Sequence, residues 1–315
     1  SGFFGCLIYS RSFSECNLYR KMKNNSLFED ICNGKWALTF NAYQSLYPVF
    51  SKLLQGNDIN FELKAKQLIE FYDESYNLVK ANKEGYLEIP FGSTVVLNMI
   101  GPMVTYGNWW YYGADEIVSQ LKKYDANPNV KAILIFMDGP GGATSAIPPF
   151  LEFGNERDKS KPLGIVYDKM CSAHLYAAYG MQPDFVWAQN KMSEAGSLGI
   201  MLSYINDAKW MEMNGLERVA VYADESEDKN LPIRLALEGK FELIKKEALS
   251  PLAIMFQEDM IAFNPDLKKD VPGVLTGKTF YAEDAVKVGF AKRIGTIAEA
   301  LRELTITSEL NHYKK

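Results

Sequence analysis

The chain has 315 residues, of which 47% are hydrophobic and 23% are charged, and its formal net charge is −5. These proportions are ordinary for a folded soluble protein that is long enough to bury a core. The acidic balance, with no basic run longer than two residues, argues against nucleic acid or an anionic membrane as a partner.

Cysteine and histidine content argues against a metal site. The cysteines form no CxxC pair, and two histidines in the whole chain cannot complete a Cys/His zinc site of the usual spacing. We expect no metal and no cofactor. A disulfide among Cys6, Cys16 and Cys32 stays open, but reduced thiols in a cytoplasmic protein are the favoured interpretation. The N-terminus lacks the layout of a signal peptide, and no window reaches the roughly 18 apolar residues of a membrane helix.

Residues 1–88 differ in texture from the rest and predict a small helical N-terminal region. The stretch 61–82 places apolar residues among charges at helical spacing. The earlier stretch 41–54 is also helix-like, although Pro48 interrupts it.

From residue 89 the pattern changes to alternating strands and helices, which predicts an α/β domain over 89–300, followed by a polar tail at 301–315. An almost continuous apolar run at 130–139 is typical of a strand buried on both faces. The order strand, helix, strand indicates βαβ units and a mostly parallel sheet. We expect strands at 93–101, 130–139, 162–168 and 184–189, and helices at 113–127 and 235–262.

The buried strand runs into the sequence Asp-Gly-Pro-Gly-Gly, which ends at Gly142. Adjacent glycines after a strand permit positive φ and let backbone N–H groups point into open space, where they can hold a developing oxyanion. A plain turn is the alternative, and this motif alone does not exclude it.

A second candidate is Ser172, at the turn between a strand and a helix of small residues. A hydroxyl there would be aided by the helix N-terminus, although serine is also a common N-cap. His174 lies about 200° around the helix from Ser172, and His312 lies in the polar tail. A serine without a histidine can instead be activated by a lysine whose pKa is lowered by burial. The sequence offers several candidates: Lys169, Lys191, Lys209, Lys229, Lys240 and Lys278.

The sequence resembles the signal peptide peptidase A (protease IV) family of Ser-Lys peptidases, especially its shorter phage-type members. Five segments match the family's landmarks in order, over about residues 90–300. They are NPNVKAILIFMDGPGG, CSAHLYAAY, EAGSLGIM, VYADESEDKNLP and GVLTGKTFYAEDAVKVGFAKRIGT. Each motif is weak alone, and their order makes the resemblance specific.

The resemblance implies a Clp protease/crotonase-like fold of repeated ββα units and a serine endopeptidase. Ser172 would be the nucleophile and Lys229 the general base. The amides of Gly142, Ala173 and Gly141 would form the oxyanion hole, with His174 and Ser197 at the substrate. Peptide or protein substrate would bind as an added strand.

The resemblance also implies a homo-oligomer, with the lysine often supplied by a neighbouring subunit. Phage head maturation in a prohead, or signal-peptide degradation in a bacterial cytoplasm, would be its role.

The chain departs from the family pattern near these residues. Gly139 replaces the serine of the family's SPGG turn, and Ala173 and His174 replace the glycine pair after the nucleophile. Ser226 stands where a glycine precedes the lysine, so the alignment at Lys229 is less firm than at Ser172.

Three rival interpretations remain open. Cys171 and His174 are three residues apart and could share a helix face as a Cys-His pair, although a reactive thiol needs an exposed, electropositive setting. A catalytically inactive oligomeric scaffold or head-assembly protein of the same fold is the main alternative. A crotonase-type hydratase acting on coenzyme A thioesters ranks last, because no acidic pair lies beside the glycine turn.

Overall fold

A computed structural model describes residues 35–38, 68–107, 111–204, 206, 208–217 and 219–313. The stretch 41–54, and Cys6, Cys16 and Cys32 with any disulfide among them, lie outside these residues. Among the described residues, no helix has the length and apolar character needed to cross a membrane.

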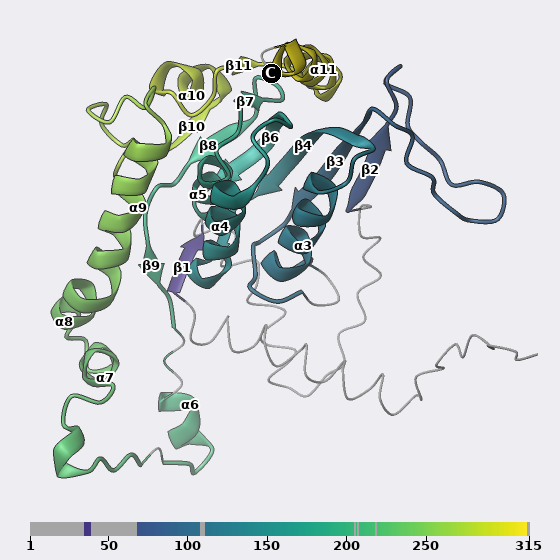
Figure 1. Cartoon of the computed structure of the whole chain (residues 1–315). Coiled ribbons are helices and arrows are strands. Elements are labelled where there is room, and N and C mark those ends of the chain that lie inside the picture. Colours follow the sequence, from purple (N-terminus) through teal and green to yellow (C-terminus); the bar gives the residue numbers. More distant parts are fainter. Residues whose placement is uncertain are drawn as a thin grey trace, which may run out of the picture.

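A large mixed sheet forms the centre of the molecule (Figure 1). Its middle strands are parallel to one another, and its path runs β10-β8-β6-β4-β3-β2, with β7 and β11 attached beside β6. The strands are β2 (Ile69–Tyr72), β3 (Ser93–Ile100), β4 (Val130–Gly139), β6 (Leu163–Cys171), β7 (Phe185–Ala188), β8 (Glu194–Gly196), β10 (Thr279–Tyr281) and β11 (Arg293–Ile294).

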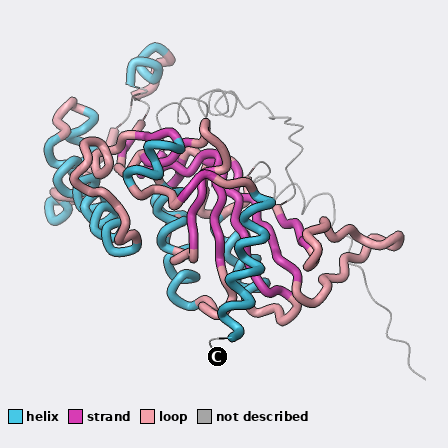
Figure 2. The backbone as a smooth tube through the Cα atoms, turned by 90° about the horizontal axis from the view of Figure 1, so that it is seen from above, coloured by secondary structure: helices cyan, strands magenta, loops and turns pink. Residues whose placement is uncertain are grey.

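Helices cover both faces of this sheet (Figure 2). Alternate side chains of β3 and β4 point to opposite faces, as the twofold repeat of a strand requires. Val95, Ile133 and Ile135 face the larger core with α3, α4 and α5, whereas Val96 and Leu134 face a smaller core under α11. This two-sided burial explains why the central strands are apolar throughout. The covering helices are α3 (Ala114–Asp125), α4 (Pro148–Glu156), α5 (Ala173–Gly180), α10 (Ala282–Val288) and α11 (Ile297–Tyr313).

A small second sheet lies at the carboxyl ends of the central strands. Its order is β5-β1-β9, and β1 is antiparallel to both neighbours. The strands are β1 (Lys35–Leu38), β5 (Gly141–Ala143) and β9 (Met201–Leu202), and a 3₁₀ turn at Thr144–Ala146 follows β5.

After β9 the chain forms an arm that extends from the sheet before α9 returns along α5 (Figure 1). Tyr176 of α5 stacks on Phe256 of α9 at a ring-centroid distance of 4.4 Å and donates a hydrogen bond to Asp259. These contacts fix α9 against the domain. The arm contains α6 (Ala208–Met213), a 3₁₀ turn at Asp224–Ser226, α7 (Leu231–Leu237), α8 (Glu242–Ile244), a π-helical turn at Lys245–Leu249 and α9 (Ser250–Phe263).

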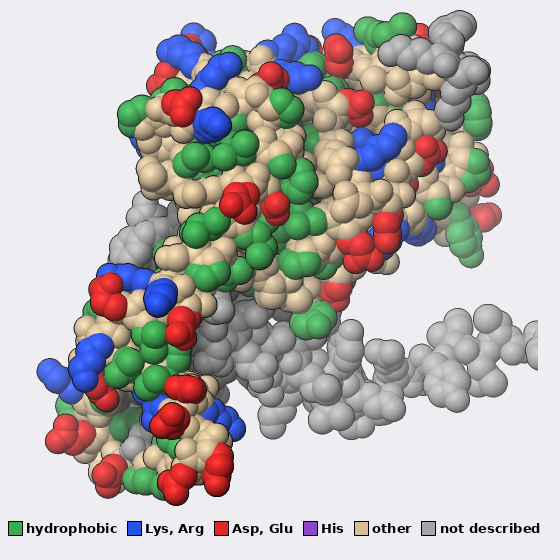
Figure 3. Space-filling view, turned by 60° about the vertical axis from the view of Figure 1, so that its left-hand side comes forward, with side chains coloured by type: hydrophobic (Ala, Val, Ile, Leu, Met, Phe, Trp, Pro, Cys, Tyr) green, Lys and Arg blue, Asp and Glu red, His purple; other side chains and the backbone are tan. Residues whose placement is uncertain are grey.

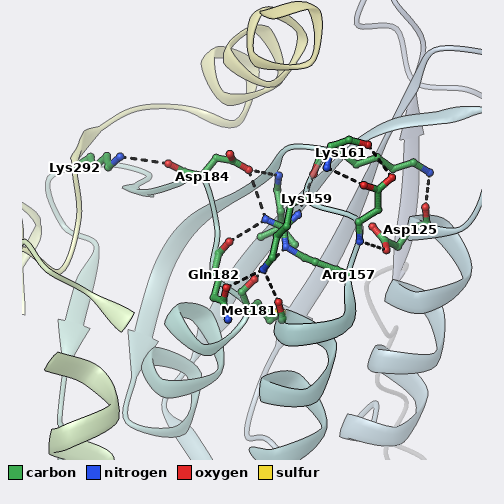
Figure 4. A network of polar contacts seen from close by, with 12 residues as sticks. Asp125, Arg157, Lys159, Lys161, Met181, Gln182, Asp184 and Lys292 are labelled. Atoms are coloured by element: carbon green, nitrogen blue, oxygen red, sulfur yellow. Dashed lines mark hydrogen bonds and ion pairs between the residues drawn. The ribbon is translucent and has the colours of Figure 1, made fainter. Parts of the chain in front are cut away.

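A polar cluster closes the amino ends of β6 and β7 (Figure 4). The buried Arg157 guanidinium donates hydrogen bonds to the backbone carbonyls of Met181, Lys161 and Gln182, at 3.2, 2.9 and 2.9 Å. It also lies 3.7 Å from the carboxylate of Asp184. The cluster ties the ends of α4, α5 and the two strands together.

The predicted α/β class is confirmed, and so are the expected strands at 93–101, 130–139, 162–168 and 184–189. The helix expected over 61–82 is wrong within the described residues, because Ile69–Tyr72 is a strand paired antiparallel to β3. The helix expected at 235–262 is interrupted at Gly239, whose φ is +81°. The expected tail at 301–315 is helical through Tyr313, and Leu301 and Leu304 of α11 pack in the smaller core.

Candidate active site

Ser172 lies at the sharp turn between β6 and α5. Its backbone has φ +55° and ψ −113°, a conformation that costs a residue with a side chain about 1–3 kcal/mol. The turn is held by two hydrogen bonds: Ser172 N–H donates to the Gly196 carbonyl at 2.8 Å, and the Ser172 carbonyl accepts from Tyr176 N–H at 3.0 Å. A strained strand–turn–helix of this kind is how several hydrolases present a nucleophile.

The Ser172 side chain does not cap α5. It makes no capping hydrogen bond, and its hydroxyl donates only a long bond of 3.4 Å to the Gly199 carbonyl. The structure therefore disfavours the N-cap interpretation. The first amides of a helix have no partner within it, so the N–H of Ala173 is available near this hydroxyl.

The glycine turn lies near Ser172. It is held in shape by hydrogen bonds to Met103, three residues after the end of β3. Met103 N–H donates to the Gly141 carbonyl at 2.8 Å, and Ala143 N–H donates to the Met103 carbonyl at 3.0 Å. A Cβ at position 142 would lie 2.1 Å from the Met103 carbonyl oxygen, so only glycine fits. Because the Gly141 carbonyl and the Ala143 N–H bond to Met103 and polar groups alternate along a strand, the N–H and C=O of Gly142 point to the opposite side, toward β1.

His174 is buried beneath the glycine turn. Its Nδ1 accepts a hydrogen bond from Gly141 N–H at 3.2 Å. Burial lowers the pKa of His174 to about 3, so the ring is neutral at physiological pH. In this arrangement the Gly141 amide is already occupied, whereas the Gly142 amide faces the small sheet. His174 therefore has the environment of a residue that positions the glycine turn, at which the oxyanion hole is predicted.

Two of the chain's departures from the family pattern complement each other. A Cβ at position 139 would lie 2.1 Å from Cε1 of His174. Gly139 therefore leaves the room that the His174 ring fills.

Ser197 follows the bend at Gly196 and also has positive φ, +57°. Its N–H donates to the Lys278 carbonyl at 3.0 Å, and its side chain is partly exposed. The role predicted for Ser197 at the substrate stays a prediction.

Lys229 lies on the arm, between the 3₁₀ turn at Asp224–Ser226 and α7. Its N–H donates to the Ser226 carbonyl at 3.0 Å, and its side chain is exposed. Among the described residues, the Lys229 amine forms no hydrogen bond or ion pair, and none joins it to Ser172. The pairing of Ser172 with Lys229 therefore stays a prediction. Lys169, closer in sequence, is 4.0 Å from the Glu194 carboxylate.

The rival Cys-His pair finds no support in this geometry. Cys171 is buried in β6, and burial raises the pKa of its thiol to about 12. A thiol in this state is protonated and a poor nucleophile. His174 is engaged with Gly141, and the side chain of His312 lies outside the described residues.

Sequence reasoning missed the part played by Met103 and Gly199. Gly101-Pro102 marks the end of β3, but nothing in the sequence shows that the next residue pairs with the glycine turn. Within the described residues, no group of three or more histidine, cysteine, aspartate or glutamate side chains could hold a metal ion.

Comparison with known proteins finds two curated relatives of low identity. It is 23% identical over 191 residues to a candidate protease of Methanocaldococcus jannaschii, a match that covers 59% of each chain. The predicted resemblance to the signal peptide peptidase A family is confirmed. A second relative, the head-tail preconnector protein GP5 of Enterobacteria phage P21, is 22% identical over 197 residues, covering 60% of this chain and 37% of that protein. The chain thus matches 59% and 37% of the length of these two curated relatives. No protein-family model matches.

The solved structures similar to this chain have Clp-like and crotonase-like folds. A mutant of the 1510-N membrane-bound stomatin-specific protease is 15% identical, with a TM-score of 0.43 over 69% of this chain and 85% of that chain. A candidate enoyl-CoA hydratase/isomerase from Acinetobacter baumannii is 16% identical, with a TM-score of 0.38 over 75% of this chain and 86% of that chain.

Proposed function

We propose that this protein is a serine endopeptidase in which Ser172 is the nucleophile and Lys229 is the general base. The observation that carries the proposal is the strained turn at Ser172, whose hydroxyl makes one long contact, to the Gly199 carbonyl. A structural serine gains nothing from such strain, whereas a nucleophile gains a fixed, lightly bound hydroxyl.

In the proposed reaction the hydroxyl oxygen attacks the carbonyl carbon of a peptide bond. The amides of Gly142 and Ala173 stabilise the oxyanion that develops on the carbonyl oxygen. An uncharged lysine amine accepts the serine proton and returns a proton to the leaving amine. Water then hydrolyses the acyl ester.

The base is proposed to reach the serine across a subunit contact. The arm that carries Lys229 exposes several large apolar side chains, among them Met213 at 82%, Val219 at 74% and Val221 at 89%. Figure 3 shows apolar side chains among charged ones on this arm. Such exposure is a sign of an interaction surface, and a second copy of the chain is the proposed partner.

The favoured biological role is the cleavage of proteins that take part in phage assembly. The support is the relative named as a head-tail preconnector protein of phage P21. Signal-peptide degradation has no comparable support. An inactive scaffold is the second candidate function, favoured by the exposed position of Lys229 on the arm.

Hydrolysis of casein by the purified chain and its variants tests the proposal. We expect Ser172→Ala and Lys229→Ala each to lose at least a hundredfold in activity. Lys209→Ala, which removes another exposed amine from the arm, should retain it. Wild-type activity should rise through mildly alkaline pH, because only the free amine accepts a proton. Undetectable hydrolysis by the wild-type oligomer would favour the scaffold, and full activity of Lys229→Ala would exclude this lysine as the base.

A further inference from the structure

Strand β1 occupies a position between the two edges that flank the candidate site. It pairs antiparallel with β5 on one side and with β9 on the other. About a hundred residues of sequence separate β1 from β5, so this pairing is not a local hairpin. An extended segment held by main-chain pairing on an exposed sheet edge is also how many proteins bind peptides. Figure 1 shows β1 beside β9, near α4 and α5.

The β5 side determines which bond faces the glycine turn. Ala37 is the partner of Gly142, and Leu38 is the partner of Gly141. The polar groups of Gly142 point toward β1, because the Gly141 carbonyl and the Ala143 N–H are bonded to Met103 on the other side. The carbonyl of Ala37 is therefore the one opposite the Gly142 amide.

The β9 side leads to the same bond. Lys35 pairs with Leu202 and Trp36 pairs with Met201. Continued in the same register, the pairing places Leu38 opposite Gly199. The Gly199 carbonyl is the group that the Ser172 hydroxyl contacts, at 3.4 Å. The printed β5 register and this extension of the β9 register both point to the Ala37–Leu38 peptide bond.

The complete burial of Ser172 agrees with a site that is occupied by a segment of the chain itself. Its exposed fraction is 0%. An incoming peptide cannot reach a fully buried hydroxyl while the neighbouring segments keep this arrangement.

We propose that residues Lys35–Leu38 are the chain's own first substrate and that the Ala37–Leu38 bond is the one cut; this rests on the proposed peptidase function.

The cleavage is a hydrolysis with water as the only co-reactant. The Ser172 oxygen forms a bond to the Ala37 carbonyl carbon, and its proton passes to the lysine amine. The bond from that carbon to the Leu38 nitrogen breaks, and the nitrogen takes the proton and leaves as the new amino terminus. Water then adds to the ester and releases the Ala37 carboxylate and the Ser172 hydroxyl.

Intact-mass measurement and N-terminal sequencing of the incubated full chain test this inference. We expect a fragment that begins at Leu38 in the wild type and an uncut chain in Ser172→Ala. Ala37→Pro should not be cut, because proline lacks the N–H that faces the Gly142 carbonyl. Ala37→Gly is the matched control: it keeps the N–H and a small residue, and should still be cut. A synthetic peptide of residues 33–40, cut by the full chain between Ala37 and Leu38, gives the same test and does not depend on the folding of a variant.

The outcomes separate this inference from the proposed function. Hydrolysis of casein with the chain and the peptide both uncut at Ala37–Leu38 would overturn the inference and leave the peptidase in place. A cut at a different bond of this segment would also overturn it. Failure to hydrolyse casein, peptide and chain alike would instead remove the proposed function.

Discussion

The two ends of β6 are built in opposite ways. At the amino end, Leu163 N–H donates to the Asp184 carboxylate at 2.8 Å, and Arg157 uses each of its guanidinium nitrogens on a backbone carbonyl. At the carboxyl end, Ser172 has positive φ, and its hydroxyl makes one contact of 3.4 Å. One end is tied down by several hydrogen bonds, and the other presents a strained serine whose hydroxyl is lightly bound.

The difference indicates where the molecule places stability and where it places chemistry. Backbone strain persists only where the surrounding structure enforces it, and such strain collects at functional sites. Ligands of open α/β sheets also bind outside the carboxyl ends of the strands. The amino end therefore reads as an anchor and the carboxyl end as the candidate site.

Removing the anchor should have the largest effect on stability. Arg157→Met leaves three carbonyl oxygens and the Asp184 carboxylate without the guanidinium. Each buried acceptor left without a donor costs about 1–3 kcal/mol, so the free energy of unfolding, measured with urea, should fall by about 3–5 kcal/mol. Activity per folded molecule should not change.

Lys159→Met in the same cluster provides the control for this prediction. Lys159 donates to the Gly154 carbonyl at 2.5 Å and to Gln182 Oε1 at 2.9 Å, both near the surface, and its loss should cost about 1 kcal/mol. Equal losses for both variants would contradict the account of the anchor.

Crowding the glycine turn should have the next largest effect. In Gly139→Ala the added Cβ meets the His174 ring, and overpacking of this kind costs about 1–3 kcal/mol. Combining it with His174→Ala should recover part of the loss, because the second change removes the ring, while the Gly101 carbonyl oxygen, 2.7 Å from the added Cβ, remains. A double-mutant cycle of urea unfolding measures this coupling. Simple additivity of the two losses would mean that Gly139 and His174 are independent.

The sequence predicted part of the fold and part of the candidate site. Long apolar runs predicted the central strands, because a strand buried on both faces needs no information from elsewhere in the chain. The Gly-Gly turn and Ser172 were found from local spacing and from the family resemblance. That Gly139 and His174 compensate each other needed coordinates, since they are 35 positions apart (174 − 139).

Other features could not be read from the sequence, because they depend on pairing with distant residues. Leu68 and Phe71 are three residues apart, which suits a helix face, yet β2 is a strand because β3 offers it an edge. The pairing of β1 with β5 and β9 is equally non-local. Lys229 was assigned by resemblance, and no local signal distinguishes it from the other lysines of the arm.

The pH dependence of stability should report the buried state of His174. Its pKa is about 3 in the folded chain and 6.5 as the ordinary value. Below pH 6.5 the unfolded chain therefore binds a proton that the folded chain does not, and stability falls as the pH falls toward 3. This contribution is at most about 1.4 kcal/mol per pH unit, and it is absent above pH 6.5.

His174→Gln removes the titrating group and keeps a hydrogen-bond acceptor, so its unfolding free energy should depend less on pH in that window. Urea unfolding of both proteins between pH 7 and pH 4 provides the measurement. Parallel curves for wild type and variant would show that His174 is not buried as a neutral ring.

Relieving the strain at the other end of β6 should have the smallest effect, and it has the opposite sign. Ser172→Gly should raise the free energy of unfolding by about 1 kcal/mol, because glycine adopts positive φ without strain, while peptidase activity is lost. Ser119→Gly, on the exposed face of α3, should lower it by about 0.5 kcal/mol. A loss of stability in Ser172→Gly equal to that in Ser119→Gly would contradict the assignment of strain.

Covalent labelling tests the central claim most directly. A fluorophosphonate reacts with an activated serine hydroxyl, and peptide mapping by mass spectrometry identifies the modified residue. Under conditions in which the protein hydrolyses casein, the account predicts one adduct, on Ser172, with no adduct in Ser172→Ala. An adduct on a different residue, or none at all while casein is being hydrolysed, would contradict it.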